Sequence, residues 1–143
     1  MPNDRTTNEN ALPPLLAQSL EASLTVADVR RSVAWYCDAL RFSVDQEFER
    51  GGRLLAVSMR AGAIRILLTQ DDGAKGIGRV KGEGFSLQIT TAQDIDTLAS
   101  NAKRAGAVLD SEPADAWGAR VFRLRDPDGF RLVFTSPRAP DQR

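Results

Sequence analysis

The sequence repeats one pattern twice, which is the strongest constraint on its fold. Asp28 and Asp94 each follow a short apolar segment and precede apolar residues at helical spacing. Each copy ends in a pair of alternating segments typical of a hairpin, within 54–68 and 121–134. A unit of this size does not easily bury its apolar face alone, so the two copies are expected to pack together. The repeat also predicts a ligand site on the surface between the copies.

The composition favours one soluble domain with a small-molecule partner. A chain of 143 residues is long enough to bury a sizeable core. Its 19 basic residues balance 19 acidic residues, which argues against nucleic acid as a partner. Cys37 is the only cysteine, so no intrachain disulfide is possible and nothing indicates an oxidising compartment. No segment resembles a secretory signal or a membrane span, so a cytoplasmic location is expected.

The chain divides into a leader, one domain and a tail. We predict a flexible leader at 1–18, with Leu12, Leu15 and Leu16 docking on the body, and a tail at 137–143. The predicted domain spans 19–136 and consists of module one at 19–70, a linker at 71–84 and module two at 85–136. The glycines and basic residues of the linker also resemble a phosphate-binding loop. The linker interpretation is preferred because no helix follows, as a phosphate loop requires.

Capping residues predict where both helices begin and end. The carboxylates of Asp28 and Asp94 are suited to accept hydrogen bonds from the first helical turn. Gly106 is a typical stop for the second helix, whereas the first ends at Arg41, where a left-handed backbone would cost about 1 kcal/mol. Asp126-Pro127-Asp128-Gly129 favours a hairpin turn rather than a calcium loop, since Phe130 and Leu132 supply no further oxygen ligands.

Two segments, VADVRRSVAWYCDALRF at 26–42 and WGARVFRLRDPDGFRLVF at 117–134, resemble the vicinal oxygen chelate superfamily. This superfamily includes glyoxalase I, extradiol dioxygenases and the bleomycin and fosfomycin resistance proteins. The resemblance covers roughly 19–136. It implies an α+β fold in which two tandem βαβββ modules form a curved mixed-sheet cup, the glyoxalase/bleomycin resistance fold. It also implies a homodimer, commonly with two such cups.

Family enzymes usually hold a divalent metal between the first and last strands of the modules. By the resemblance, the four ligand places fall on Glu21, on Leu87, on Val133, and on Ile66 or its neighbour Leu67. Only Glu21 is able to bind a cation, and the chain contains no histidine. A catalytic zinc needs about three protein ligands, and harder cations need several oxygens. We therefore expect no metal and no other cofactor.

The absence of histidine also removes the commonest general base near neutral pH. Glu21 is the one candidate acid or base, and burial against Leu87 and Val133 would raise its pKa. A structural salt bridge or a solvated strand end is an equally good interpretation of Glu21. Cys37 is interpreted as a buried, inert apolar residue in preference to a nucleophile.

Aromatic and basic residues near the expected cup are candidates for ligand contact. Trp117 has no periodic reason to be buried, and in drug-binding family members such aromatics stack on planar ligands. The other candidates are Phe85 and Phe122, although core packing is the better interpretation for each, as it is for Trp35 and Tyr36. Strand alternation places Arg131 on the same face as Val133, where it would pair with Glu21, bind a ligand acid or form an outward salt bridge. Arg120 is a weaker candidate of the same kind.

These observations favour a metal-independent protein that binds a planar or amphipathic small molecule in the cup, as resistance proteins of the bleomycin type do. An alternative is an enzyme, either a lyase or isomerase that uses Glu21 or a metalloenzyme with unusual ligands. A third interpretation is an interaction module whose cup is filled by its own side chains. Each interpretation retains the scaffold of the family.

Overall fold

A computed structural model describes residues 12–76 and 78–138, and it contains the predicted pattern twice. Module one consists of β1 (Ala22–Val26), α1 (Val29–Leu40), β2 (Ser43–Arg50), β3 (Arg53–Ala61) and β4 (Ile64–Gln70). Module two consists of β5 (Ser86–Thr90), α2 (Ile95–Arg104), β6 (Leu109–Ala116), β7 (Ala119–Arg125) and β8 (Arg131–Pro137). The predicted α+β fold of two βαβββ modules is therefore confirmed.

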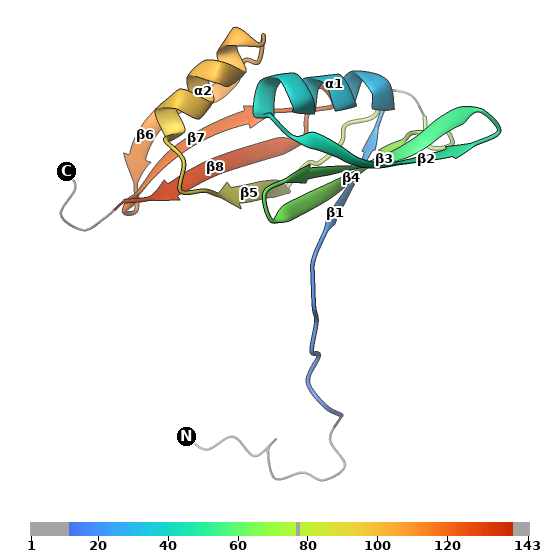
Figure 1. The fold of residues 1–143 in the computed structure, drawn as a ribbon, viewed down its shortest axis with the longest axis horizontal. Coiled ribbons are helices and arrows are strands. Elements are labelled where there is room, and N and C mark those ends of the chain that lie inside the picture. The colour runs from blue at the N-terminus through green and yellow to red at the C-terminus, as the bar shows by residue number, and fades with distance from the viewer. Residues whose placement is uncertain (1–11, 77, 139–143) are drawn as a thin grey trace.

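Each module forms a mixed sheet of four strands. The strand orders are β1-β4-β3-β2 and β5-β8-β7-β6, with the first strand of each module parallel to the last. Figure 1 shows α1 and α2 together on one side of the two sheets, and the two helices contact each other. Each sheet therefore has a covered face beneath the helices and an opposite face that no described helix covers. The latter is called the open face below.

A single core joins the two modules through their covered faces. Tyr36 and Met59 from module one and Phe122 and Leu132 from module two are all almost fully buried in one cluster. The Phe122 and Phe134 rings stack at 5.1 Å between centroids. Because successive residues of a strand alternate between the faces, the residues just before and after these core residues along each strand point to the open faces. The packing expected from the repeat is thus achieved by helices and covered sheet faces together.

The predicted helix starts are confirmed. The Asp28 side chain accepts a hydrogen bond from the Arg31 amide at 3.2 Å, and the Asp94 side chain accepts one from the Thr97 amide at 2.9 Å. Arg41 has a φ of 63°, so the first helix ends in a left-handed residue that is not glycine, as the sequence suggested. The strain is confined to this one residue, which is exposed to solvent.

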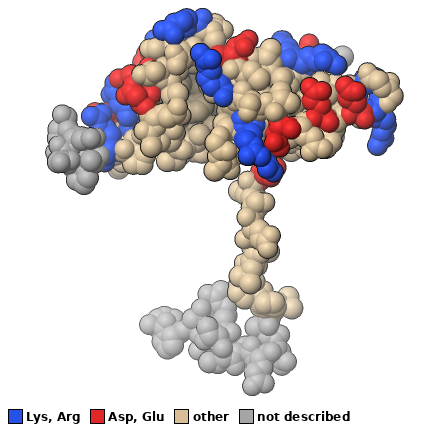
Figure 2. Space-filling model, in the orientation of Figure 1, with Lys and Arg blue, Asp and Glu red and all other residues tan. Residues whose placement is uncertain are grey.

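The N-terminal segment stands away from the body. Leu12, Leu15 and Leu16 are between 86% and 90% exposed, so the expected docking of these side chains on the body is wrong for this chain alone. Figure 1 shows the segment leading away from the body below β1, and Figure 2 shows it as a run of uncharged residues. The rest of the predicted leader, 1–11, and most of the predicted tail, 139–143, lie outside the described residues. No helix in the described part of the chain is long and apolar enough to cross a membrane.

Candidate functional site: a pocket on the open face of module two

The open face of module two carries three arginines on two neighbouring strands. Leu124 and Leu132 are buried beneath α2, so alternation places their neighbours Arg123, Arg125 and Arg131 on the open face. Arg125 lies directly opposite Arg131 in the antiparallel register, and Arg123 lies opposite Val133. The register therefore clusters three guanidinium groups around the end of β7 and the start of β8.

A pocket with a volume of about 270 Å³ lies at this position and is called the open-face pocket. Its lining residues come from the start of β5, from β7 and β8, and from β6, and they are Gly84, Phe85, Ser86, Asp110, Arg123, Leu124, Arg131, Leu132 and Val133. Phe85 is 45% exposed, so part of its ring is open to solvent. The pocket thus combines an exposed aromatic ring and an apolar strand with cationic groups.

Only one carboxylate balances the three arginines. Asp110 accepts a hydrogen bond from Arg125 Nε at 2.9 Å. Among the described residues, neither Arg123 nor Arg131 forms an ion pair. The expected pairing of Arg131 with Glu21 is therefore absent, and the pocket retains two unneutralised cations.

The structure places three of the seven residues named from sequence in this pocket: Phe85, Arg131 and Val133. Two others lie on the covered face of the sheet. Leu87 pairs in register with Leu132 and packs against the core, and Phe122 is fully buried beneath α2. Both side chains therefore point away from the open face, because successive residues of a strand face opposite sides, and the burial of Phe122 agrees with the core packing preferred for it from sequence.

Trp117 and Glu21 lie elsewhere in the molecule. Trp117 occupies the two-residue turn between β6 and β7, is 102% exposed and has a φ of 54°. This turn is at the opposite end of β7 from Arg125, about 20 Å away for a strand of seven residues. Glu21 is exposed and lines a different cavity beside Arg60 and Arg65 of module one. Its expected burial against Leu87 and Val133 is thus wrong.

The two remaining chemical candidates have structural explanations. Arg120 contacts Asp96 at 3.1 Å and Asp115 at 3.2 Å, and the hydrogen bonds that it donates to Asp96 are the main reason that its pKa is raised. Burial raises the pKa of the Cys37 thiol, and the neighbouring Asp38 carboxylate adds to this effect. A raised pKa disfavours the reactive thiolate, in agreement with an inert Cys37.

A second cavity, of about 790 Å³, lies between the modules as the repeat predicted. It is bounded by the end of α1, the β3–β4 turn, the end of β5 and the first turns of α2. None of the seven residues named from sequence lines it. The cavity between the modules is therefore separate from the open-face pocket, which contains the candidate residues Phe85, Arg131 and Val133.

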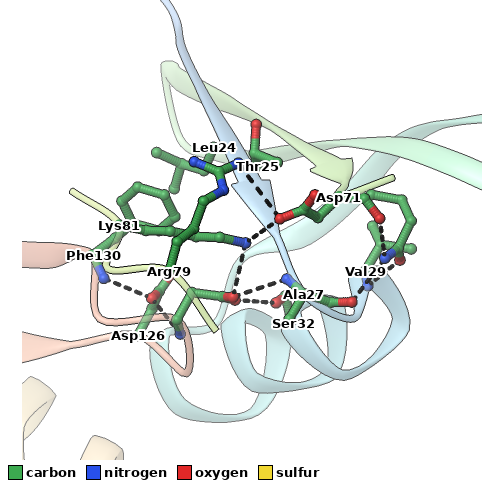
Figure 3. Close-up of polar contacts among 12 residues, drawn as sticks. Leu24, Thr25, Ala27, Val29, Ser32, Asp71, Arg79, Lys81, Asp126 and Phe130 are labelled. Carbon is green, nitrogen blue, oxygen red and sulfur yellow. Dashed lines mark hydrogen bonds and ion pairs between the residues drawn. The ribbon is translucent and has the colours of Figure 1, made fainter. Parts of the chain in front are cut away.

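A polar network joins the two modules at the start of α1. Lys81, only 8% exposed in its side chain, places Nζ 2.9 Å from Asp71 Oδ2 and 3.6 Å from Asp128 Oδ1 (Figure 3). Asp128 also accepts a hydrogen bond from the Ala27 amide at 2.8 Å. Lys81 of the glycine-rich linker is thus held by carboxylates, which supports the linker interpretation over a phosphate-binding loop.

The Asp126-Pro127-Asp128-Gly129 segment forms the predicted turn and also anchors α1. Tyr36 Oη donates a hydrogen bond to Asp126 Oδ2 at 2.8 Å, and both groups are buried. Burial raises the pKa of Asp126, whereas the hydrogen bonds from Tyr36 and from two backbone amides oppose the increase. Sequence reasoning identified the turn and missed this role, since the two partners are 90 residues apart.

The donor set does not fit the divalent metal of the family enzymes. In the register of the strands, Leu67 and Val133 occupy open faces, Ile66 and Leu87 occupy covered faces, and Glu21 alone carries an oxygen ligand. Within the described part of the chain, no group of three or more histidine, cysteine, aspartate or glutamate side chains is arranged to hold a metal ion. No chemical step is therefore assigned to a metal.

Two tandem βαβββ modules, each with a mixed sheet of four strands, are the architecture of the glyoxalase/bleomycin resistance fold. Residues 18–134 match the family model described as the glyoxalase/bleomycin resistance protein/dioxygenase superfamily, and the chain belongs to this superfamily. No curated protein gives a significant sequence match.

Solved structures share the fold at low sequence identity. TioX from Micromonospora sp. ML1 is 19% identical with a TM-score of 0.67, over 85% of this chain and 99% of that chain. TnmS3, an antibiotic binding protein from Streptomyces sp. CB03234, is 16% identical with a TM-score of 0.68, over 87% and 99%. The hypothetical protein SA1046 from S. aureus is 20% identical with a TM-score of 0.67, over 85% and 95%. At these identities the likeness concerns the fold alone.

Proposed function

We propose that this protein binds a planar or amphipathic small molecule in the open-face pocket without the help of a metal. The observation that carries the proposal is the pocket itself, in which the half-exposed Phe85 ring and Val133 lie beside uncommitted polar groups. Ligand pockets typically combine apolar walls with a few polar groups that orient the ligand. That TnmS3, with the same fold, is an antibiotic binding protein supports a sequestering or resistance-type role.

We further propose that the protein acts as a homodimer in the cytoplasm. Burial of the exposed leucines near the N-terminus by a second copy would remove an apolar surface from water. The pocket volume, about 270 Å³, is just below the usual range for ligand sites, and walls contributed by a second copy would bring it into that range. A single unpaired cysteine is compatible with a reducing compartment.

A panel of planar aromatic compounds, followed by thermal shift and calorimetry, tests the binding proposal. Replacing Phe85 with alanine is expected to weaken binding by about 2- to 10-fold, the usual contribution of one aromatic contact. Trp117→Ala is the matched control, because it removes an exposed aromatic at the far end of β7 and is expected to leave affinity unchanged. Equal losses in both variants, or no binding by any compound, would contradict the proposal.

Metal analysis of protein purified without chelator tests the second part of the proposal. We expect no stoichiometric divalent ion and the same ligand affinity before and after treatment with a chelator. A divalent ion at one equivalent per chain would overturn metal independence and favour the alternative of a metalloenzyme with unusual ligands.

A further inference from the structure

We infer that the ligand of the open-face pocket carries an acidic group, and that Arg123 and Arg131 bind it. The inference rests on the proposed function and specifies the chemical class of the ligand. It points to an aromatic carboxylate, or a larger aromatic compound with an acidic end, rather than to a neutral or cationic molecule.

The strand register brings the arginines together. Side chains directly opposite each other in an antiparallel pair have Cβ atoms about 5 Å apart, and diagonal neighbours are about 7 Å apart. Arg131 is directly opposite Arg125 and diagonal to Arg123. Arginine side chains are longer than these separations, so the guanidinium groups of Arg123 and Arg131 are able to converge on one ligand group. Both residues line the same pocket as Phe85.

The cluster contains three arginines and one carboxylate, so it carries an excess of positive charge. Like charges on directly opposed strand positions destabilise a sheet. Asp110 neutralises only Arg125, to which it is joined at 2.9 Å, and the remaining two arginines have no described carboxylate partner. A ligand acid would complete the balance. A guanidinium group is well suited to this task because its planar donors match the two oxygens of a carboxylate.

The surroundings of the arginines indicate an aromatic body for the ligand. Phe85 contributes an exposed ring, and Leu124, Leu132 and Val133 contribute apolar or backbone surface. A volume of about 270 Å³ is sufficient for a body of one or two fused rings. An acid alone, such as inorganic phosphate, would leave the apolar part of the pocket unused.

The test uses 2-naphthoate and its neutral amide of nearly the same shape, 2-naphthamide, with the full-length protein. In isothermal titration calorimetry we expect the acid to bind at least about tenfold more tightly, as one to two charge-assisted hydrogen bonds predict. Amide chemical-shift changes at Ser86 and Val133 locate the bound acid. The double variant Arg123→Gln/Arg131→Gln is expected to abolish the preference while the affinity for the amide changes by less than about twofold.

A double variant at remote arginines is the control. Arg50→Gln/Arg104→Gln removes the same amount of positive charge, at the β2–β3 turn and near the end of α2, and is expected to keep the preference for the acid. Loss of the preference in this control would assign it to net charge and overturn the inference.

Three other results distinguish failure of the inference from failure of the proposed function. Equal binding of acid and amide would overturn the acidic ligand and leave the binding function intact. No binding of either probe or of the neutral aromatic panel would overturn the function, and the inference with it. A change in dimer formation in the Arg123→Gln/Arg131→Gln variant, with no change in probe preference, would assign the arginines to an interface between copies and overturn the inference.

Discussion

Replacing Tyr36 with phenylalanine removes one oxygen atom from the core and retains the ring. The ring keeps its edge-on contacts with Trp35 and Phe42, at 4.9 and 5.5 Å between centroids. Asp126 Oδ1 still accepts from two backbone amides, but Oδ2 loses its hydrogen bond from Tyr36. A buried carboxylate oxygen without a donor costs about 1.5–3 kcal/mol. For a chain of this length, we expect the melting temperature to fall by about 5–10 °C.

The effect of Tyr36→Phe depends on pH with a defined sign. Burial holds the folded-state pKa of Asp126 above its usual value, so the ionised carboxyl costs stability at neutral pH and the cost is relieved as pH falls through that pKa. Removing the Tyr36 hydrogen bond raises the pKa further. The destabilisation by Tyr36→Phe is therefore expected to be largest at pH values well above the pKa and to shrink toward acid pH. Urea denaturation followed by circular dichroism over a pH series measures this.

A second background tests whether the effect comes from the pair. In an Asp126→Ala protein the Tyr36 hydroxyl is buried without its acceptor, so adding Tyr36→Phe is expected to be neutral or stabilising. If the double variant does not fold, the pH series on Tyr36→Phe alone still tests the argument. A loss below about 0.5 kcal/mol at neutral pH, or a loss that grows toward acid pH, would refute the reasoning.

Two further substitutions test local strain and burial. Arg41→Gly removes the strain of a left-handed residue that is not glycine. It is expected to stabilise the protein by about 0.5–1 kcal/mol, after allowing for the more flexible unfolded chain. A lower melting temperature in this variant would contradict the prediction. Lys81→Met leaves the Asp128 carboxylate without a cation and Asp71 with Arg79 alone. It is expected to lower the urea midpoint far more than Lys103→Met, which removes an equally short but exposed contact with Glu112. Similar shifts in the two lysine variants would show that burial does not control the effect.

The sequence predicted those features that depend on neighbours along the chain. The caps at Asp28 and Asp94 and the stop at Arg41 follow from interactions within one helical turn, so they were visible without the fold. The roles of Asp126 and Lys81 were not visible, because their partners are brought close only by the packing of the modules.

The candidate site was predicted in part, for a reason of register. Arg131 and Val133 were assigned to one face by alternation, and both line the open-face pocket. Leu87 was assigned to the same face from its distance to Asp94, and an uncertainty of one residue is enough to reverse a strand position. Arg123 was not named, although the alternation of β7 carries the signal that its side chain points away from the core.

The corner between β1 and α1 contains two amides with different partners. The Val29 amide donates to Gln70 within module one at 2.9 Å, whereas the Ala27 amide donates to Asp128 of module two at 2.8 Å. Hydrogen exchange at Val29 therefore follows the opening of one module, and exchange at Ala27 follows the separation of the two. Ala27 and Val29, which are only two residues apart, thus report separately on the separation of the two modules and on the local opening of module one in a single spectrum.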